Sequence, residues 1–248
     1  MNNLDTELTT VLRDSGALDN AFFRRCRSER IDQAKLRQLV ANFYPITETF
    51  ALSSFAYCEN LSRRIAGETP DDGVISREKL EEFLGKVVEV TAVEFNINHV
   101  ISPDRFHFNS FCRLAPKLGM PVDDVKRRRY PIEPETTALE SALRRNFRDA
   151  DMLGGLANIY AIETSALNII TTLENAFVGQ QTADGSQLYS DHELEHITLH
   201  KTLEVEHDSE ARQLVALLNP STTTDARLKE KVTELTSLLS SFWNKLAK

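Results

Sequence analysis

The sequence predicts an all-α protein, and three observations support this fold class. Long segments carry apolar residues at intervals of three and four positions, which places them on one face of a helix. The chain lacks the alternating β-branched runs that strands favour, and only nine of its 248 residues are glycine. No repeats and no long linker divide it. We therefore expect a single domain over residues 1–248, a compact bundle of eight to ten helices.

Prolines and polar residues delimit the predicted helices of the first half. An apolar stripe over 36–43 continues over 50–61, and Pro45 between them predicts a kink or a break into two helices. Ser76 is a candidate N-cap for a helix that reaches about Asn96.

The second half divides in the same way. Ser102-Pro103-Asp104 predicts the start of a helix that ends at Gly119, followed by a short basic helix. Segments 136–150 and 151–178 predict two helices, the second apolar on nearly all sides and therefore central. Asp191 can cap a helix to about Leu218, and a final helix follows Pro220.

Charge and composition exclude several classes of function. The chain has 37 acidic and 29 basic residues, and its densest basic run is only Lys126–Arg129, so nucleic acid is not the expected ligand. No run approaches about 18 apolar residues, so no membrane span is expected. Cys26, Cys58 and Cys112 form no CxxC pair and the first residues do not resemble a signal peptide, which predicts a reduced, cytoplasmic protein.

The segment HITLHKTLEVEHDSEA, residues 196–211, contains the first candidate metal ligands. His200, Glu204 and His207 are spaced i, i+4 and i+7, so they share an arc of about 60° on one helix face. Imidazole nitrogens and carboxylate oxygens suit iron, manganese or zinc. A solvated charged face is the alternative interpretation, and His196 is expected to lie behind the ligands or face solvent.

Glu163 strengthens the metal hypothesis. It lies in LANIYAIETSALNII, where the neighbouring residues leave almost no polar face. A buried carboxylate needs a cation or hydrogen-bond donors. A metal ion is the preferred partner here, with an arginine or Tyr160 as the alternative.

Two further candidate ligands lie upstream, in VVEVTAVEFNINHVISPDRFHFNSF. Glu94 ends an apolar helix, and His107 lies between two phenylalanines at the start of the next helix. A histidine so placed can equally be a packed core residue, and His99 is the competing candidate ligand.

The two Glu-x-x-His motifs, Glu193-x-x-His196 and Glu204-x-x-His207, fall on one predicted helix, whereas ferritin-like bundles place them on two. The order Glu94, His107, Glu163 and then His200-x3-Glu204-x2-His207 instead resembles the haem-oxygenase-like diiron oxidases, which include CADD-like proteins and are related to the PqqC and TenA families. The segments NAFFRRCRSERIDQAKLRQLVANFYPITETF and HFNSFCRLAPKLGM also resemble this family.

This resemblance implies a haem-oxygenase-like bundle with two ferrous ions, the second weakly held, and dioxygen as co-substrate. The six residues just named would be the ligands, Glu163 would also take part in catalysis, and manganese is an open alternative to iron. The substrate would be a small amino acid, amine or fatty acid, and a homodimer is possible. The activity would be that of a non-haem oxidase or oxygenase.

Other functions are weighed against this one. A metal-free helical interaction protein would present its charges outward, and a single-zinc hydrolase has no use for two extra carboxylates. A haem oxygenase needs a histidine near the N-terminus, where this chain has none before His99. A cofactorless PqqC-like or TenA-like enzyme would need a basic pocket or a nucleophilic cysteine.

Overall fold

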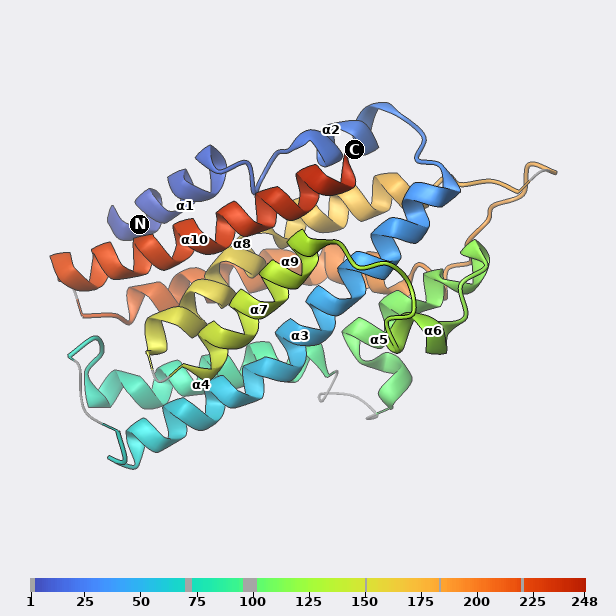
Figure 1. Ribbon diagram of the computed structural model, residues 1–248. Helices are drawn as coiled ribbons and strands as arrows, with labels where there is room; N and C mark the ends of the chain where they lie inside the picture. Colours follow the sequence, from blue (N-terminus) through green and yellow to red (C-terminus); the bar gives the residue numbers. More distant parts are fainter. Residues whose placement is uncertain (1–2, 70–72, 96–101, 150, 183, 220) are drawn as a thin grey trace.

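The computed structural model describes residues 3–69, 73–95, 102–149, 151–182, 184–219 and 221–248. These residues form ten α-helices, three short 3-10 turns and no strand, which confirms the all-α prediction (Figure 1). None of these helices is both long and apolar enough to cross a membrane. The helices are α1 (Asn3–Asp14), α2 (Ala21–Ser28), α3 (Gln33–Ile65), α4 (Arg77–Glu94), α5 (His107–Phe111), α6 (Val122–Lys126), α7 (Pro134–Arg148), α8 (Met152–Phe177), α9 (Glu195–Ala216) and α10 (Thr222–Leu246).

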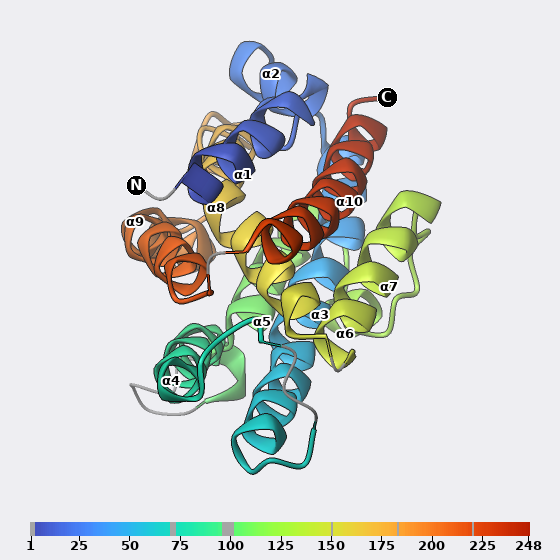
Figure 2. The ribbon, with the colours of Figure 1, turned by 90° about the vertical axis from the view of Figure 1, so that its left-hand side faces the viewer.

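Helix α8 forms the centre of the bundle. It packs against α1, α2, α3, α7, α9 and α10, and the end-on view shows these helices arranged around it (Figure 2). Its side chains are apolar on nearly every face, so burying them removes the largest possible apolar surface from water. One cluster of buried side chains runs from Leu4 to Leu246. The expected central position of this helix is confirmed.

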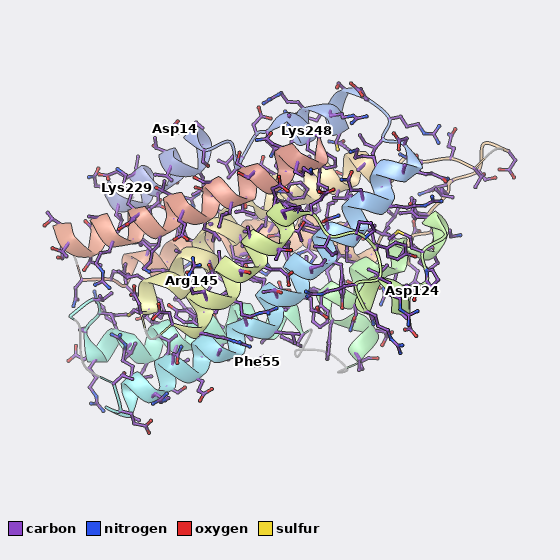
Figure 3. The ribbon with its side chains drawn as sticks, viewed as in Figure 1. Asp14, Phe55, Asp124, Arg145, Lys229 and Lys248 are labelled. Carbon is purple, nitrogen blue, oxygen red and sulfur yellow. The ribbon has the colours of Figure 1, made fainter. Side chains whose placement is uncertain are left out.

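Charged side chains lie at the periphery of the bundle. Figure 3 shows Asp14, Asp124, Arg145 and Lys229 at its outer surface. Several pair there across elements, for example Arg145 with Glu234 at 2.6 Å. Such exposed pairs contribute little to stability, since solvent screens them. The bundle is therefore stabilised mainly by its apolar core.

The structure departs from the sequence prediction at three places. Helix α3 runs through Pro45 without a break, because the residues on both sides are buried in the same core and outweigh the lost backbone hydrogen bond. Residues 103–118 form α5 and three 3-10 turns instead of one helix, although they end at Gly119 as predicted, with a positive φ of 70°. Helix α9 begins at Glu195 and not after Asp191, because Ser190 and Glu193 close a turn before it.

Helices α3 and α8 approach each other closely at one point. A Cβ atom on Gly155 would collide with the ring of Tyr57. The Tyr57 hydroxyl donates a hydrogen bond to the Met152 carbonyl at 2.7 Å, one turn earlier on α8. Glycine is thus required here for close packing, and this contact sets the distance between the two helices.

A buried polar network joins α1 to α8 and α9. The Tyr160 hydroxyl donates to Oδ1 of Asp5 at 2.8 Å, and the Arg212 guanidinium donates to the same oxygen at 2.7 Å. Thr9 contacts both donors. Tyr160 therefore binds α1 and does not bond to Glu163, which removes one alternative partner for that carboxylate.

Candidate metal centre

The six predicted ligand residues all lie in the interior of the bundle, at most 8% exposed. They come from four elements that pack around the same space: the end of α4, the start of α5, the middle of α8 and one face of α9. Their charges face inward, which argues against an outward-facing partner surface. The six are Glu94, His107, Glu163, His200, Glu204 and His207.

Glu204 lies between two histidines of its own helix. Its Oε1 is 2.6 Å from Nδ1 of His200, and its Oε2 is 3.5 Å from Nδ1 of His207. The i, i+4 and i, i+3 spacings place both rings beside this carboxylate, as the sequence predicted. Glu204 is only 2% exposed, so its charge is balanced within the protein.

Glu163 reaches the same group from α8. Its Oε2 is 3.5 Å from Nδ1 of His207. Single ligand atoms of Glu163, Glu204 and His207 lie within 4.8 Å of one another, close enough to share one metal ion. Glu163 lies in the middle of α8, whose residues are mostly buried, and this position explains why its side chain is almost entirely shielded from solvent.

Glu94 and His107 form a second pair beside His200. Nδ1 of His107 is 3.6 Å from Oε1 of Glu94, and the His107 ring lies 4.3 Å from the His200 ring, centroid to centroid. The pair is close in space because the end of α4 and the start of α5 both lie against α9. His99, the competing candidate, lies outside the described residues.

His196 is a further histidine at the site. It is 4% exposed, its Nδ1 lies 3.1 Å from the Ser110 hydroxyl, and its ring centroid lies 4.4 Å from that of His200, with the two rings tilted by 51°. The sequence left two places open for His196, either behind the ligands or facing solvent. Its burial shows that the second is wrong. The i, i+4 spacing of His196 and His200 was the sequence signal that both rings lie on the same helix face.

Several polar atoms of the site have no hydrogen-bond partner among the described residues. They are Nδ1 of His107, Nε2 of His200 and Oε2 of Glu204, all buried. Buried polar atoms are nearly always paired, so unpaired ones need an explanation. A cation accepts electron pairs from such nitrogens and oxygens, and the mixed histidine and carboxylate set suits iron. The residues present therefore fit a metal ion.

Burial and mutual contacts shift the pKa values of the acidic residues. Burial raises the pKa of Glu163 to about 7. Burial also acts to raise the pKa of Glu204, but its hydrogen bond with His200 and its close contact with His207 outweigh burial and lower that pKa to about 2. The pKa of Glu94 is lowered because its contact with His107 likewise outweighs burial.

The pKa values of the histidines shift in opposite directions. Burial lowers the pKa values of His196 and His200, so both are neutral and available as electron-pair donors. Burial disfavours a charged His207 as well, but Glu163 and Glu204 outweigh it and raise its pKa to about 11. A protonated His207 thus supplies the positive charge that the carboxylates require in the metal-free protein.

A cavity of about 70 Å³ adjoins the cluster. Its polar end is formed by site residues, including Glu163, His196 and Glu204. Sequence reasoning did not identify the rest of its wall, because only the tertiary arrangement brings α3, α8 and α10 together. The apolar wall includes Phe43, Phe50, Ile162, Ala166, Leu239 and Trp243.

The cysteines are not part of this wall. The thiols of Cys26 and Cys112 are buried, and burial raises the pKa of each to about 12. Cys58 is partly buried beside Thr91. A nucleophilic cysteine requires a lowered pKa and access to the substrate, and these thiols have neither.

The fold matches those of solved structures along its whole length. A TenA homologue from Pseudomonas syringae aligns with 98% of this chain and 90% of its own, at a TM-score of 0.69 and 14% identity. A domain of unknown function with a haem-oxygenase-like fold, from Shewanella denitrificans, has a TM-score of 0.62 at 12% identity, with 98% and 88% covered. This chain has the haem-oxygenase-like fold.

A third solved structure also has a similar fold. It is a CADD-like protein of unknown function from Nostoc punctiforme, with a TM-score of 0.64, 15% identity, and 98% of this chain and 96% of the other covered. The expected haem-oxygenase-like bundle is confirmed. No protein-family model and no curated protein matches the sequence itself.

Proposed function

We propose that this protein is a non-haem, iron-dependent oxidoreductase that activates dioxygen at a dinuclear iron site and acts on a small organic substrate. One observation carries the proposal: six histidine and glutamate side chains converge in the interior beside a cavity. Buried carboxylates need positive charge to balance them, and metal ions would supply it to the whole group, where the metal-free protein has only a protonated His207. The haem-oxygenase-like fold is consistent with this assignment.

The ligand atoms divide into two groups that share Glu204. Glu94, His107 and His200 would hold one ion with one oxygen of Glu204, and Glu163 and His207 would hold the other with its second oxygen. When bound, the ferrous ions would supply the electrons that reduce dioxygen. A carboxylate between two cations lowers their mutual repulsion.

The protein's own residues have separate roles in this proposal. His200 is a neutral-ring donor, the His107 ring lies 4.3 Å from it, and Ser110 fixes the ring of His196 beside them. Glu163 lines the cavity and also contacts His207, so it faces both the substrate and the ligand set. We assign it as the catalytic residue. The apolar wall excludes water from the reacting groups.

The alternative functions are less well supported. A metal-free interaction protein would expose these charges, yet all six are buried. A cofactorless TenA-like enzyme remains the second candidate because the fold is similar, but a TenA-like nucleophile would have to be a cysteine at the cavity. Cys26 and Cys112 are deep in the core with pKa values of about 12.

The test is an anaerobic titration of the metal-free protein with ferrous iron, followed by exposure to oxygen with optical and Mössbauer detection. We expect two irons per chain and a coupled diferric signal. Manganese is titrated in parallel, to decide which metal is preferred. Binding of only trace iron and manganese would reject the proposal and leave the cofactorless alternative.

A further inference from the structure

The cavity wall divides sharply into a polar and an apolar part. All of its ionisable side chains belong to the metal centre or to His196 beside it. The remaining described wall has two polar side chains. The Thr47 hydroxyl already donates to the Tyr44 carbonyl at 2.9 Å, and the Trp243 indole N–H is uncharged and can only donate. No lysine or arginine is among the described residues that line the cavity. A charged group in this part of the cavity would therefore lose its hydration without gaining an opposite charge.

The size and shape of the cavity restrict the ligand further. Its volume of about 70 Å³ is less than half of the about 150 Å³ that accommodates benzene in an apolar protein cavity. On α8, Ala166 lies one turn after Glu163 and Ile170 one turn after that, so a stripe leads from the catalytic carboxylate along the wall. Ala166 is the smallest side chain of this stripe and leaves the space that a ligand would occupy.

From these observations we infer that the substrate carries a narrow, uncharged aliphatic chain, which packs along Ala166 and against the α10 wall while its polar group faces the metal centre. Amino acids and amines with a charged side chain are excluded as substrates. The statement that this molecule is a substrate rests on the proposed function. The class of ligand rests on the cavity alone. Ala166 is the residue that determines how wide the chain can be.

The protein contains its own reporter for this cavity. Trp243 is the single tryptophan of the chain and lines the cavity from α10. Its indole Nε1 is buried without a hydrogen-bond partner among the described residues. Emission of Trp243 therefore responds to a molecule that enters, in the metal-free protein as well as in the metal-loaded one.

The experiment titrates the protein, loaded with redox-inert Zn²⁺, with propanol and with aminopropanol, which differ by one ammonium group at the far end of the chain. We expect propanol to change Trp243 emission saturably, and aminopropanol to require a concentration higher by about tenfold or more. Equal or tighter binding of aminopropanol would overturn the inference.

Two substitutions by phenylalanine on the same helix locate the binding site. Ala166→Phe fills the cavity and should abolish the response to propanol, whereas Leu167→Phe, at a 42% exposed position, should leave it unchanged. If Ala166→Phe does not fold, Leu239→Ala enlarges the cavity instead and should favour pentanol over propanol by about tenfold relative to the unmodified protein. An unchanged response in a folded variant would contradict the inference.

The metal content of each sample separates this inference from the proposed function. If the protein retains neither zinc nor iron, the proposed function fails, and the propanol titration of the metal-free protein still decides the ligand class. If metal binds but propanol leaves Trp243 emission unchanged, the ligand class is wrong and the proposed metal centre stands.

Discussion

Glu204 contacts two histidines with its two oxygens: Oε1 lies 2.6 Å from Nδ1 of His200 and Oε2 lies 3.5 Å from Nδ1 of His207. One carboxylate thus connects the two halves of the candidate metal centre. The sequence predicted that Glu163 takes part in catalysis and that Glu204 is one of six ligands. In the structure Glu204 has the central position, and both carboxylates line the cavity.

We predict that Glu204→Gln reduces iron binding in both halves of the site. The amide keeps the shape but loses the charge that balances two cations, so affinity should fall at least about tenfold. Equilibrium titration with ferrous iron measures this loss. Glu206→Gln, an exposed change on the same helix, is the control and should bind like the unmodified protein. Equal loss in both variants would contradict the central role of Glu204.

We expect His200→Ala to abolish iron loading while leaving the helical circular dichroism nearly unchanged. The substitution removes one ligand atom from the group that includes His107, but His200 is not needed to form α9. Metal analysis of the purified variant gives the iron content. His192→Ala changes an exposed histidine before the helix and should retain full loading. Full iron content in His200→Ala would disprove the ligand assignment.

Gly155→Ala should destabilise the bundle by about 1–3 kcal/mol, because the added methyl group overpacks the contact with Tyr57. Denaturant unfolding measures this change. The matched control is Gly85→Ala on α4, where a Cβ atom meets no neighbour and alanine should stabilise the helix by about 0.5–1 kcal/mol. Two changes of the same sign would show that helix propensity, and not packing, dominates.

Tyr160→Phe should cost about 1–3 kcal/mol of stability, because the Asp5 carboxylate loses a buried donor. Iron binding should be retained, since the Tyr160 hydroxyl points to α1 and not to Glu163. Parallel measurement of unfolding and of iron stoichiometry separates the two effects. Loss of iron with full stability would place this tyrosine in the metal centre instead.

The stability of the protein should fall with rising alkaline pH partly because of Cys112. Burial raises the pKa of this thiol from 9.0 to about 12 in the folded chain. The neutral thiol therefore favours the native state below pH 9, and this contribution is lost between pH 9.0 and about 12, at up to about 1.4 kcal/mol per pH unit.

Comparison with Cys112→Ala isolates the contribution of this thiol, because other groups also titrate at alkaline pH. Unfolding free energies of both proteins are measured from about pH 8 to about pH 11. The unmodified protein should lose stability more steeply than the variant. Parallel slopes would show that the native thiol ionises as easily as the unfolded one.

The sequence contained much of the site because helical spacing is a local property. His200, Glu204 and His207 share a face through their separation alone, and Glu163 stands out because its neighbours are apolar. The pairing of Glu94 with His107 was less certain, since it depends on the turn between two helices. It could be proposed only from the resemblance to a family.

Other features depend on tertiary structure and could not be predicted. Local rules for proline favour a break at Pro45, but the packing on both sides of it keeps α3 continuous. The unbroken helix predicted from Pro103 to Gly119 was replaced by short turns. The cavity wall from Phe43 and Trp243 joins residues far apart in the chain, and no periodicity in the sequence indicates that they meet.

Helix α10 supplies the last wall of the cavity, through Leu239, Phe242 and Trp243. A ribosome makes these residues after all six proposed ligand residues have been joined to the chain. The nascent polypeptide therefore carries the proposed ligands before α10 can cover the cavity. A metal ion that binds at the proposed centre during synthesis would thus meet a more open site than one that binds after α10 has docked.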